Sequence, residues 1–532
     1  MSLLSLEGYG ESLALIDGDS NRTLSYRQLD DLCKKMRPAL EFNLETADQD
    51  GKVMQDFDLE PLTAGGDYSQ KGKEPPDISG YGSKDCVNLP SSTAVFRFNR
   101  GLIFLFCQNG IEDIIAYLGS LNAGHVVCLL DSRMNAAFQE EFIHIYHPHL
   151  IIGYRELTHH MYHKTCLPGI SLHAYQLNDL KQGPVLHPEL QLLLTTSGTT
   201  GNPKLIRLSR TNILSNARSI VQYLNITGAE IAIASLPFHY SYGLSVLHTH
   251  LYAGACVVLT QASVAQTAFW EVATKYHCTS LAGVPYTYKI MERIGFDRFI
   301  PPSLKTLTQA GGHLEVPLVL KYHTLMQERG GRFFVMYGQT EATARIAYLD
   351  PKFLPEKAGA IGQAIPEGHL EVYEQEREID TPHEEGELVY KGPNVMLGYA
   401  STRKDLIKGD ELRGVLRTGD IGYFDDEGVF FVSGRLKRIS KIYGLRINLD
   451  DVEHALMAYG INMAAVTTTE ANIIVTLEEA DKKKYPECIE YLAKVYRLHP
   501  STFICRFVFE LPRTPSGKID YQKLYHPLED GI

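Results

Sequence analysis

The chain has 532 residues, of which 44% are apolar and 21% are charged, and its formal net charge is −12. This length exceeds what one hydrophobic core usually serves, so we expect two to four packing units. The negative charge argues against general nucleic-acid binding, which needs a positive surface, but a nucleotide site needs only a few local cations.

The N-terminus and the cysteines predict a cytoplasmic protein. Met1 to Glu7 lack the basic and apolar regions of a signal peptide, and no run of about 18 apolar residues is present to span a membrane. The nine cysteines form no C-x-x-C pair, and several have apolar neighbours. This usage is typical of reduced, mostly buried thiols.

The first half of the chain predicts alternating strands and helices. A strand at 13–17 is followed by a Gly-Asp turn and then by a helix that contains Leu29 and Leu32. From about 42 to 92 the pattern gives way to polar, Gly- and Pro-containing sequence, which predicts an insertion or a surface loop. Buried strands at 101–106 and 125–130 then flank a helix at 111–121, and the alternation continues over 150–340.

This alternation predicts the α/β fold class, with a parallel sheet covered by helices. After residue 368, short strands such as 387–390 and 429–432 predict a barrel-like segment. About 100 residues of mixed helix and strand character follow Gly434. We therefore expect a large N-terminal domain of layered α/β subdomains with a barrel-like segment at 1–433, and a small α+β C-terminal domain at 434–532.

The segment at 195–204 is the first candidate for chemistry. It reads Thr-Thr-Ser-Gly-Thr-Thr-Gly-Asn-Pro-Lys, after an apolar strand at 192–194 and before a helix that begins near Thr211. Small residues let backbone amides approach an anion, the hydroxyls donate hydrogen bonds, and Lys204 adds a positive charge. An isolated cluster of this kind is usually a polar turn, but the long match that ends in Pro-Lys favours phosphate binding.

Two other nucleotide-binding classes do not fit. A kinase or GTPase loop needs a lysine directly after its second glycine and a hydroxyl after the lysine, whereas Gly201 is separated from Lys204 and Leu205 follows. A dinucleotide-binding oxidoreductase is disfavoured because no G-x-G-x-x-G follows a strand.

The segment at 195–204 resembles the acyl-adenylate-forming superfamily, which includes acyl-CoA synthetases, adenylation domains of peptide synthetases and luciferases. Further motifs of that family follow in the same order. They are Y-G-x-T-E at 337–341, T-G-D at 418–420, a Gly-Arg element at 434–437 and P-x-T-x-x-G-K at 512–518. The resemblance spans about residues 12 to 525. It implies ATP and Mg²⁺ as cofactors, and a small C-terminal lid that swings about Lys437.

The resemblance also implies a role for each motif residue. Contacts to the nucleotide fall on Thr196, Ser197, Gly198, Thr199, Thr200, Gly201, Lys204, Gly311, Gly312, Tyr337, Gly338, Gln339, Thr340, Asp420 and Arg435. The catalytic residues would be Lys518, Glu341, Thr196 and Lys204. Glu341 would hold Mg²⁺, which prefers hard oxygen ligands. Lys518 would offset the repulsion between the acid and the α-phosphate, both of which are anions.

Candidate residues for the acid are His239, Tyr240 and Gly311. His239 resembles a residue that borders the acyl pocket in the family, although a buried structural histidine is the alternative. Amino-acid-activating relatives usually carry an aspartate in this neighbourhood, where Tyr240, Ser241 and Tyr242 stand here. A carboxylic acid without an α-amino group is therefore favoured. Small residues at Gly311 and Gly312 would leave room for a flat ring or an acyl chain.

The sequence thus predicts an AMP-forming acid–thiol ligase. It would activate a small carboxylic acid as acyl-AMP and transfer the acyl group to a thiol, with coenzyme A as the first choice. The alternative acceptor is the phosphopantetheine arm of an acyl carrier protein, and a non-catalytic nucleotide-binding descendant is a further alternative. His159 and His163 have the spacing of a metal pair on a helix, but a surface cluster is the favoured interpretation.

Overall fold

The computed structural model describes residues 6–41, 100–134, 136–195, 204–442, 445–461, 463–469, 472–496, 498–513 and 519–525. The predicted insertion at about 42–92 and most of the predicted phosphate segment lie outside these ranges. The fold below is that of the described part of the chain.

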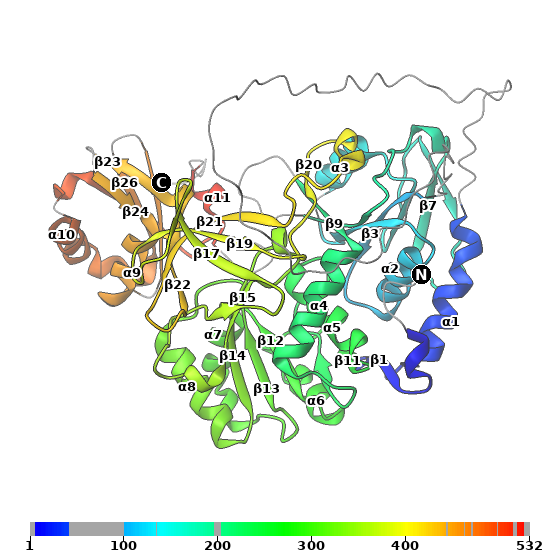
Figure 1. The fold of residues 1–532 in the computed structure, drawn as a ribbon, viewed down its shortest axis with the longest axis horizontal. Coiled ribbons are helices and arrows are strands. Elements are labelled where there is room, and N and C mark those ends of the chain that lie inside the picture. Colours follow the sequence, from blue (N-terminus) through cyan, green and yellow to red (C-terminus); the bar gives the residue numbers. More distant parts are fainter. Residues whose placement is uncertain are drawn as a thin grey trace, which may run out of the picture. The chain divides into compact units, whose positions relative to one another are not determined.

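A nine-stranded sheet forms one layer (Figure 1), in the order β16-β15-β14-β13-β12-β10-β11-β1-β2. Its strands are β1 (Leu13–Asp17), β2 (Thr23–Ser25), β10 (Ile231–Ile233), β11 (Cys256–Leu259), β12 (Ser280–Gly283), β13 (Thr306–Gln309), β14 (Arg332–Tyr337), β15 (Ala347–Leu349) and β16 (Gln363–Ala364). The strands from β14 to β1 in this order are parallel. Their carboxyl ends therefore meet at one edge, where ligands bind in open α/β sheets.

An eight-stranded sheet forms a second layer, in the order β20-β9-β8-β4-β3-β5-β7-β6. Its strands are β3 (Leu102–Cys107), β4 (Val126–Asp131), β5 (Leu150–Gly153), β6 (Tyr162–Thr165), β7 (His173–Leu177), β8 (Leu190–Thr195), β9 (Leu205–Ser209) and β20 (Gly398–Ala400). All six residues of β3 are buried. Continuous burial of this kind is expected for a parallel strand that has both faces covered.

Helices cover both sheets. They are α1 (Tyr26–Met36), α2 (Ile111–Asn122), α3 (Ala136–Tyr146), α4 (Arg210–Leu224), α5 (Ser241–Tyr252), α6 (Thr267–Lys275), α7 (Pro285–Ile294) and α8 (Val316–Glu328). Helices α4 and α5 pack on each other between the layers, because α4 contacts β8 and β9 while α5 contacts β10 and β11 (Figure 1). Aromatic side chains of α6, α7 and α8 pack on the opposite face of the nine-stranded sheet, around Phe333 of β14.

A five-stranded antiparallel sheet follows, in the order β18-β17-β19-β21-β22. Its strands are β17 (His369–Glu374), β18 (Arg377–Ile379), β19 (Gly386–Lys391), β21 (Val415–Phe424) and β22 (Phe430–Arg435). The short strands predicted at 387–390 and 429–432 correspond to β19 and β22 and are confirmed. The pairing of β21 with β22 sets Asp420 opposite Arg435, which becomes important for the site.

The C-terminal residues form a mixed unit with a core of its own. Its strands are β23 (Ile439–Ile442), β24 (Leu445–Asn448), β25 (Ala464–Thr468), β26 (Ile473–Glu478) and β27 (Phe503–Val508), and its helices are α9 (Leu449–Ala458), α10 (Tyr485–Tyr496) and α11 (Tyr521–Tyr525). Val452, Val466, Val475 and Leu492 are buried in that core. The predicted α+β character is confirmed, and the domain boundary at residue 434 stays a prediction.

Most expected elements of the first half are found within one residue of their predicted bounds. The strand at 101–106 is β3, the helix at 111–121 is α2, and the strand at 125–130 is β4. The helical spacing assigned to His159 and His163 is wrong, because His163 lies on strand β6. No group of three or more histidine, cysteine or acidic residues arranged to hold a metal occurs within the described ranges.

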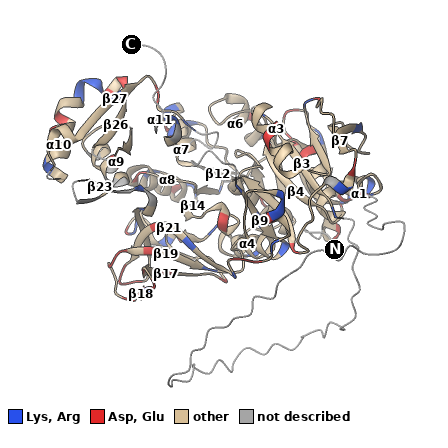
Figure 2. Cartoon of the chain, turned by 90° about the horizontal axis from the view of Figure 1, so that it is seen from above, with Lys and Arg blue, Asp and Glu red and all other residues tan. Residues whose placement is uncertain are grey.

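No helix among the described residues is long and apolar enough to cross a membrane. Acidic and basic residues are interspersed over the elements drawn in Figure 2.

Candidate active site

Four residues from three predicted motifs form one hydrogen-bonded cluster. The buried carboxylate of Asp420 on β21 accepts hydrogen bonds from the hydroxyl of Tyr337 and from Gln339 Nε2, the latter at 2.9 Å. Arg435 Nε on β22 donates to the other carboxylate oxygen at 3.0 Å. The end of β14 and the β21–β22 hairpin thus bring together residues that are about a hundred positions apart in the sequence.

The backbone around Asp420 is fixed by further hydrogen bonds. The Thr418 hydroxyl donates to the carbonyl oxygen of Leu388 at 2.7 Å, and the Gly419 amide donates to Glu387 Oε1 at 3.1 Å. Gln339 Nε2 also donates to the carbonyl oxygen of Thr418 at 2.9 Å. Asp420 is therefore held in place on β21 before any ligand binds, which lowers the entropy cost of binding.

The electrostatics keep this cluster ready to accept hydrogen bonds. Burial, and then the charge of Asp420, raise the pKa of Tyr337 well above its ordinary value, so the phenol stays protonated and donates. A carboxylate has about four acceptor positions, and the three donors leave room for a hydroxyl of a ligand. The Arg435 side chain is 59% exposed, so part of its guanidinium also faces solvent. This arrangement suits a sugar diol.

Gly338 lies between the two donors from β14 and allows a close approach of the chain. A Cβ atom at this position would lie 1.9 Å from the carbonyl oxygen of Ala344. No side chain can be accommodated at that distance without a backbone shift. The glycine of the Y-G-x-T-E motif is therefore required by the fold of the strand end, independently of any ligand contact.

Glu341 and Lys204 lie near a second site residue, Tyr399. Glu341 is in a short 3₁₀ helix, η5 (Thr340–Ala342), and its Oε1 accepts a hydrogen bond from the Tyr399 hydroxyl at 2.9 Å. Lys204 Nζ lies 5.8 Å from the centroid of the Tyr399 ring. Within the described ranges no cationic side chain pairs with the Glu341 carboxylate. A carboxylate without a cationic partner, close to a lysine suited to phosphate, fits a Mg²⁺ ion shared with phosphate oxygens.

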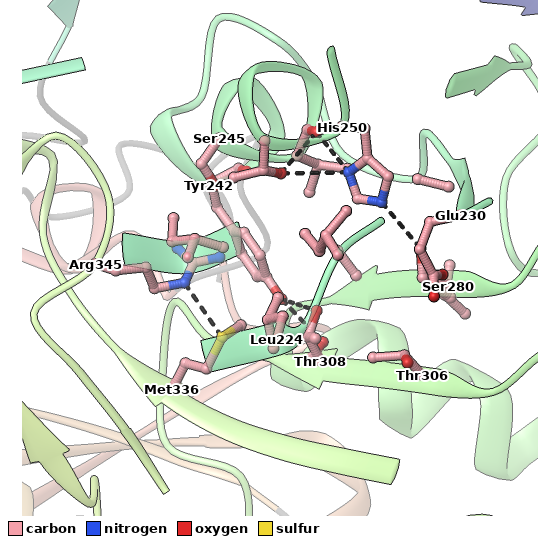
Figure 3. A pocket seen from close by; sticks show the side chains of 17 residues that line it. Leu224, Glu230, Tyr242, Ser245, His250, Ser280, Thr306, Thr308, Met336 and Arg345 are labelled. Atoms are coloured by element: carbon pink, nitrogen blue, oxygen red, sulfur yellow. Dashed lines mark hydrogen bonds between the residues drawn. The ribbon is translucent and has the colours of Figure 1, made fainter. Parts of the chain in front are cut away.

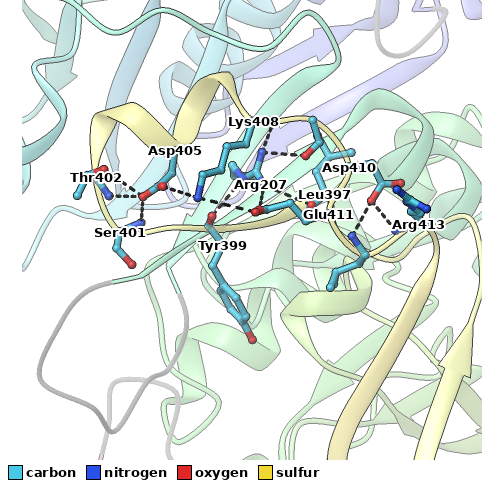
Figure 4. A network of polar contacts seen from close by, with 12 residues as sticks. Arg207, Leu397, Tyr399, Ser401, Thr402, Asp405, Lys408, Asp410, Glu411 and Arg413 are labelled. Carbon is cyan, nitrogen blue, oxygen red and sulfur yellow. Dashed lines mark hydrogen bonds and ion pairs between the residues drawn. The ribbon is translucent and has the colours of Figure 1, made fainter. Parts of the chain in front are cut away.

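The position of Tyr399 depends on the buried side chain of Arg207 on β9 (Figure 4). Arg207 donates to the carbonyl oxygens of Tyr399 and Gly409, each at 3.2 Å, and forms an ion pair with Glu411. β20, which contains Tyr399, also pairs with β9. These contacts tie the segment at 397–411 to β9 and so orient the Tyr399 hydroxyl toward Glu341.

The predicted acid-binding residues lie beside the Y-G-x-T-E motif. The Ser241 hydroxyl at the start of α5 is 3.1 Å from the Thr340 hydroxyl. Gly311 has a φ of +85°, and a Cβ atom there would lie 2.7 Å from the Tyr240 hydroxyl. Gly311 and Tyr240 are therefore brought together as expected. Gly312 is next to Pro285, whose Cγ would be 3.3 Å from an added Cβ atom.

His239 lies close to an aspartate of the second sheet. Its Nε2 is 3.7 Å from Asp131 Oδ2 at the end of β4, and its side chain is 15% exposed. Burial lowers the pKa of His239, which favours the neutral imidazole near pH 7. A role at the acyl pocket and a structural role both remain predictions for this residue.

Several predicted site residues fall outside the part of the chain that the structure describes. They are Thr196, Ser197, Gly198, Thr199, Thr200, Gly201 and Lys518, together with the side chain of the predicted hinge Lys437. The ends of the phosphate segment are nevertheless placed, because Thr195 of β8 pairs with Leu205 of β9. The helix expected near Thr211 is α4, which begins at Arg210, and strand β9 precedes it. That strand was not among the sequence predictions.

Three further residues near the site were not found by the sequence analysis: Arg207, Tyr399 and Arg345. Arg207 and Arg345 are both buried, and each interrupts an apolar run of the sequence. A charged residue in such a run was the available signal, since buried arginines are uncommon without a partner or a function. Tyr399 carries no comparable signal, because its role depends on the pairing of distant strands.

Comparison with known proteins places the chain in a family. A family described as AMP-binding enzyme matches residues 99–400. The 2-succinylbenzoate–CoA ligase of Bacillus cytotoxicus is 25% identical over 460 residues, which cover 84% of this chain and 92% of that protein. The oxalate–CoA ligase of Arabidopsis thaliana is 30% identical over 362 residues, covering 63% of this chain and 67% of that protein.

Solved structures show the same fold. O-succinylbenzoate coenzyme A synthetase from Bacillus subtilis, in complex with AMP, has a TM-score of 0.70 at 22% identity, and the match covers 99% of this chain and 98% of that one. ATP-bound MatB from Rhodopseudomonas palustris has a TM-score of 0.71 at 18% identity, covering 99% and 100%. The predicted fold class is confirmed.

The chain belongs to the AMP-binding enzyme family, since the match covers more than half of its length. The predicted superfamily and the predicted enzyme class, an AMP-forming acid–thiol ligase, are confirmed. An enzyme of this class uses ATP to activate a carboxylic acid and then transfers the acyl group to a thiol.

Proposed function

We propose that this AMP-binding enzyme is an acyl-CoA synthetase that acts on a carboxylic acid without an α-amino group. The observation that carries the proposal is the Asp420 cluster beside Glu341, which joins a diol-binding carboxylate to a metal-binding one. The family relatives named as CoA ligases support coenzyme A as the acceptor.

In the proposed complex, Asp420 and Arg435 bind the ribose hydroxyls and the Tyr337 ring borders the adenine. Gly311, Gly312 and Gln339 line the same side. The phosphates are bound by the segment at 196–201, Lys204 and Thr340. Glu341 would hold Mg²⁺, and the ion, when bound, neutralises phosphate charge. A second structure of O-succinylbenzoate coenzyme A synthetase from Bacillus subtilis, in complex with ATP and a magnesium ion, supports this assignment.

The first step joins the acid to AMP. A carboxylate oxygen attacks the α-phosphorus, the bond from that phosphorus to the bridging oxygen of pyrophosphate breaks, and pyrophosphate leaves. Lys518 contributes a positive charge between the two anions, which matters most as charge gathers at phosphorus. Thr196 and Lys204 orient the phosphates for this displacement.

The second step transfers the acyl group. A thiol attacks the acyl carbon, AMP leaves with the electron pair of the anhydride bond, and the thiol proton is lost to solvent. We propose that residues 434–532 form the C-terminal lid domain and swing about Lys437 between the steps. Such a movement withdraws Lys518 and admits the thiol, while the closed lid keeps water from the anhydride.

The proposed acid lacks an α-amino group because the segment beside His239 carries Tyr240, Ser241 and Tyr242 and no aspartate. An ammonium group would find no anionic partner in that segment, and the aspartate near His239, Asp131, already pairs with Arg133. His239, Tyr240 and Gly311 are proposed to border the acyl group.

The experiment is an AMP-forming assay with ATP, Mg²⁺ and a panel of acids, each with coenzyme A or with a phosphopantetheinylated carrier protein. We expect AMP and an acyl-CoA thioester, detected by mass spectrometry, for acids without an α-amino group. If a thioester forms only on the carrier protein, the acceptor is the carrier protein and not coenzyme A. If none of the acids in the panel leads to release of AMP, the proposal is overturned.

A further inference from the structure

A buried arginine faces a cavity between α4, α5 and the nine-stranded sheet (Figure 3). Arg345 is 3% exposed and lies four residues after Glu341, just before β15. The cavity runs from Arg345 and Met336 along Tyr242 to His250 at its other end. Because Met336 directly precedes the Y-G-x-T-E motif, this end of the cavity lies beside the predicted adenylation site.

The positive charge of Arg345 is not neutralised by any described residue. Its Nε donates to Met336 Sδ at 3.4 Å, its Nη1 donates to the carbonyl oxygen of Ala344 at 3.4 Å, and its side chain also hydrogen-bonds that of Tyr223, so all these partners are neutral. The guanidinium lies 4.0 Å from the centroid of the Tyr242 ring. Within the described ranges no carboxylate lies within ion-pair distance of it, whereas the other buried arginine on this side of the fold, Arg207, pairs with Glu411.

The tyrosines around Arg345 do not supply a negative charge. Burial raises the pKa of Tyr242 to about 12 even though Arg345 opposes the rise, and burial raises the pKa of Tyr240 as well. Both phenols are therefore neutral near pH 7. Glu230 lines the far end of the cavity, but it accepts a hydrogen bond from Thr279 and not from Arg345.

A buried charge without a counterion is costly, and proteins usually pair or hydrogen-bond such groups fully. The guanidinium keeps donor capacity, because Arg has five N–H groups in a planar fork that matches a carboxylate. The cavity has a volume of about 30 Å³, which is room for about two water-sized groups. Two oxygen atoms of one carboxylate occupy a comparable space.

Helix α5 contributes to both the cavity and the surroundings of the Y-G-x-T-E motif. Tyr242 lines the cavity, and the hydroxyl of the preceding Ser241 is 3.1 Å from that of Thr340 in the motif. A substrate whose reacting carboxylate lies near Thr340 would reach Arg345 by extending past the Tyr242 ring. The Tyr242 hydroxyl donates to the carbonyl oxygen of Thr308 at 2.9 Å, so the ring that stacks on the guanidinium is fixed.

We propose that Arg345 determines specificity by binding a second carboxylate, so that the preferred substrate is a dicarboxylic acid. This inference rests on the proposed function and adds the class of acid. One carboxylate of the substrate is adenylated, and the other pairs with Arg345 at the far side of the Tyr242 ring. The same charge disfavours an α-ammonium group in the pocket, which agrees with the proposed exclusion of amino acids.

The test compares matched acids that differ by one carboxylate. Butyrate is paired with succinate, hexanoate with adipate, and benzoate with benzene-1,2-dicarboxylate. ATP–pyrophosphate exchange gives kcat/KM for each acid with the wild-type enzyme, Arg345→Met, Arg345→Lys and Arg332→Met. Arg332, on β14 over the Phe334 ring, is the matched control because the same charge is removed outside the cavity.

We expect the wild-type enzyme to prefer at least one dicarboxylic acid over its partner by about 100-fold, the discrimination expected for a buried charged hydrogen bond. Arg345→Met should remove this preference, Arg345→Lys should retain about a tenth of it, and Arg332→Met should leave it unchanged. Because each comparison is a ratio within one variant, a loss of stability does not imitate the effect.

Equal activity of the wild-type enzyme on both members of every pair would overturn the inference and leave the proposed function intact. An unchanged ratio in Arg345→Met would also overturn it, and would show that the arginine is structural. Absence of exchange with all the acids would instead contradict the proposed function.

Discussion

The nucleotide end and the acyl end of the site are built in opposite ways. At the nucleotide end, Asp420 holds three donors, and these residues belong to sequence motifs. At the acyl end, Arg345 and Tyr242 border a cavity, and the arginine forms no ion pair with a described carboxylate. The difference fits the ligands, because the solved relatives bind AMP or ATP while the curated relatives are named for different acids.

This contrast teaches where polar groups are satisfied in advance. Hydrogen bonds that are complete before binding preorganise the site and favour a fixed ligand. A buried charge without a protein partner leaves binding energy to the ligand and gives specificity, since a ligand without the matching group leaves it unpaired. The nucleotide end should therefore resist changes of acid, and the acyl end should respond to them.

The largest effect is expected at Lys518, which serves the chemical step shared by all acids. Lys518→Ala should lower adenylation by about 10²–10³-fold, the range found when one charge-stabilising donor is removed from an active site. The comparison predicts the same factor for every acid in ATP–pyrophosphate exchange. Unchanged exchange would exclude Lys518 from the reaction, and a loss limited to some acids would assign it to the acyl end.

A smaller effect is expected for Asp420→Asn, which exchanges an acceptor for a group that also donates. The loss of charged hydrogen bonds to the sugar should cost about 2 kcal/mol, or about 30-fold in kcat/KM for ATP. Tyr337→Phe removes one neutral donor to the same carboxylate and serves as the milder control, with a loss of about 1 kcal/mol. A change in acid preference in either variant would break the proposed separation of the two ends.

The free energy of unfolding should also depend on pH, because α5, the helix that borders the acyl side, contains a buried neutral histidine. Burial lowers the pKa of His248 to about 3, and its Nε2 lies 2.8 Å from the Tyr117 hydroxyl. Below the ordinary histidine pKa of about 6.5, His248 binds a proton in the unfolded chain but stays neutral in the folded protein. The free energy of unfolding should then fall by about 1.4 kcal/mol per pH unit, or about 2 kcal/mol at pH 5, from this residue.

Urea unfolding at pH 7 and pH 5 measures this contribution. His248→Gln keeps a partner for Tyr117 and removes the titrating group. The change in the free energy of unfolding between pH 7 and pH 5 should therefore be about 2 kcal/mol smaller in this variant than in the wild-type enzyme. The same pH dependence in both proteins would mean that His248 is protonated in the fold.

The smallest effect is expected for Tyr399→Phe, which removes the hydrogen bond to Glu341. The loss in the free energy of Mg²⁺ binding should be about 1 kcal/mol. In the exchange assay, half-maximal activity should then need about a fivefold higher Mg²⁺ concentration. The ring that borders Lys204 is retained, so ATP binding without metal should change little. A large loss of exchange activity at every Mg²⁺ concentration would instead show that Tyr399 maintains the structure of the segment at 397–411.

The motifs indicated which residues come together, because Tyr337, Gln339, Asp420 and Arg435 form one hydrogen-bonded cluster, while their roles at a nucleotide stay predictions. The strands around them were also predictable, since buried apolar runs such as 101–106 match β3 closely. Arg207, Tyr399 and Arg345 were not predicted. A charge inside an apolar run was a signal for the two arginines, but the contacts of all three residues depend on strand pairing and on a cavity between layers, which the local sequence does not specify.

The central claim is that this chain adenylates a carboxylic acid without an α-amino group. ATP–pyrophosphate exchange with the wild-type enzyme, Mg²⁺ and a panel of fatty, aryl, short-chain and amino acids tests it most directly. The account predicts exchange that depends on an acid of the first three classes and is absent with amino acids. Exchange with amino acids alone, or with none of the acids, would contradict it.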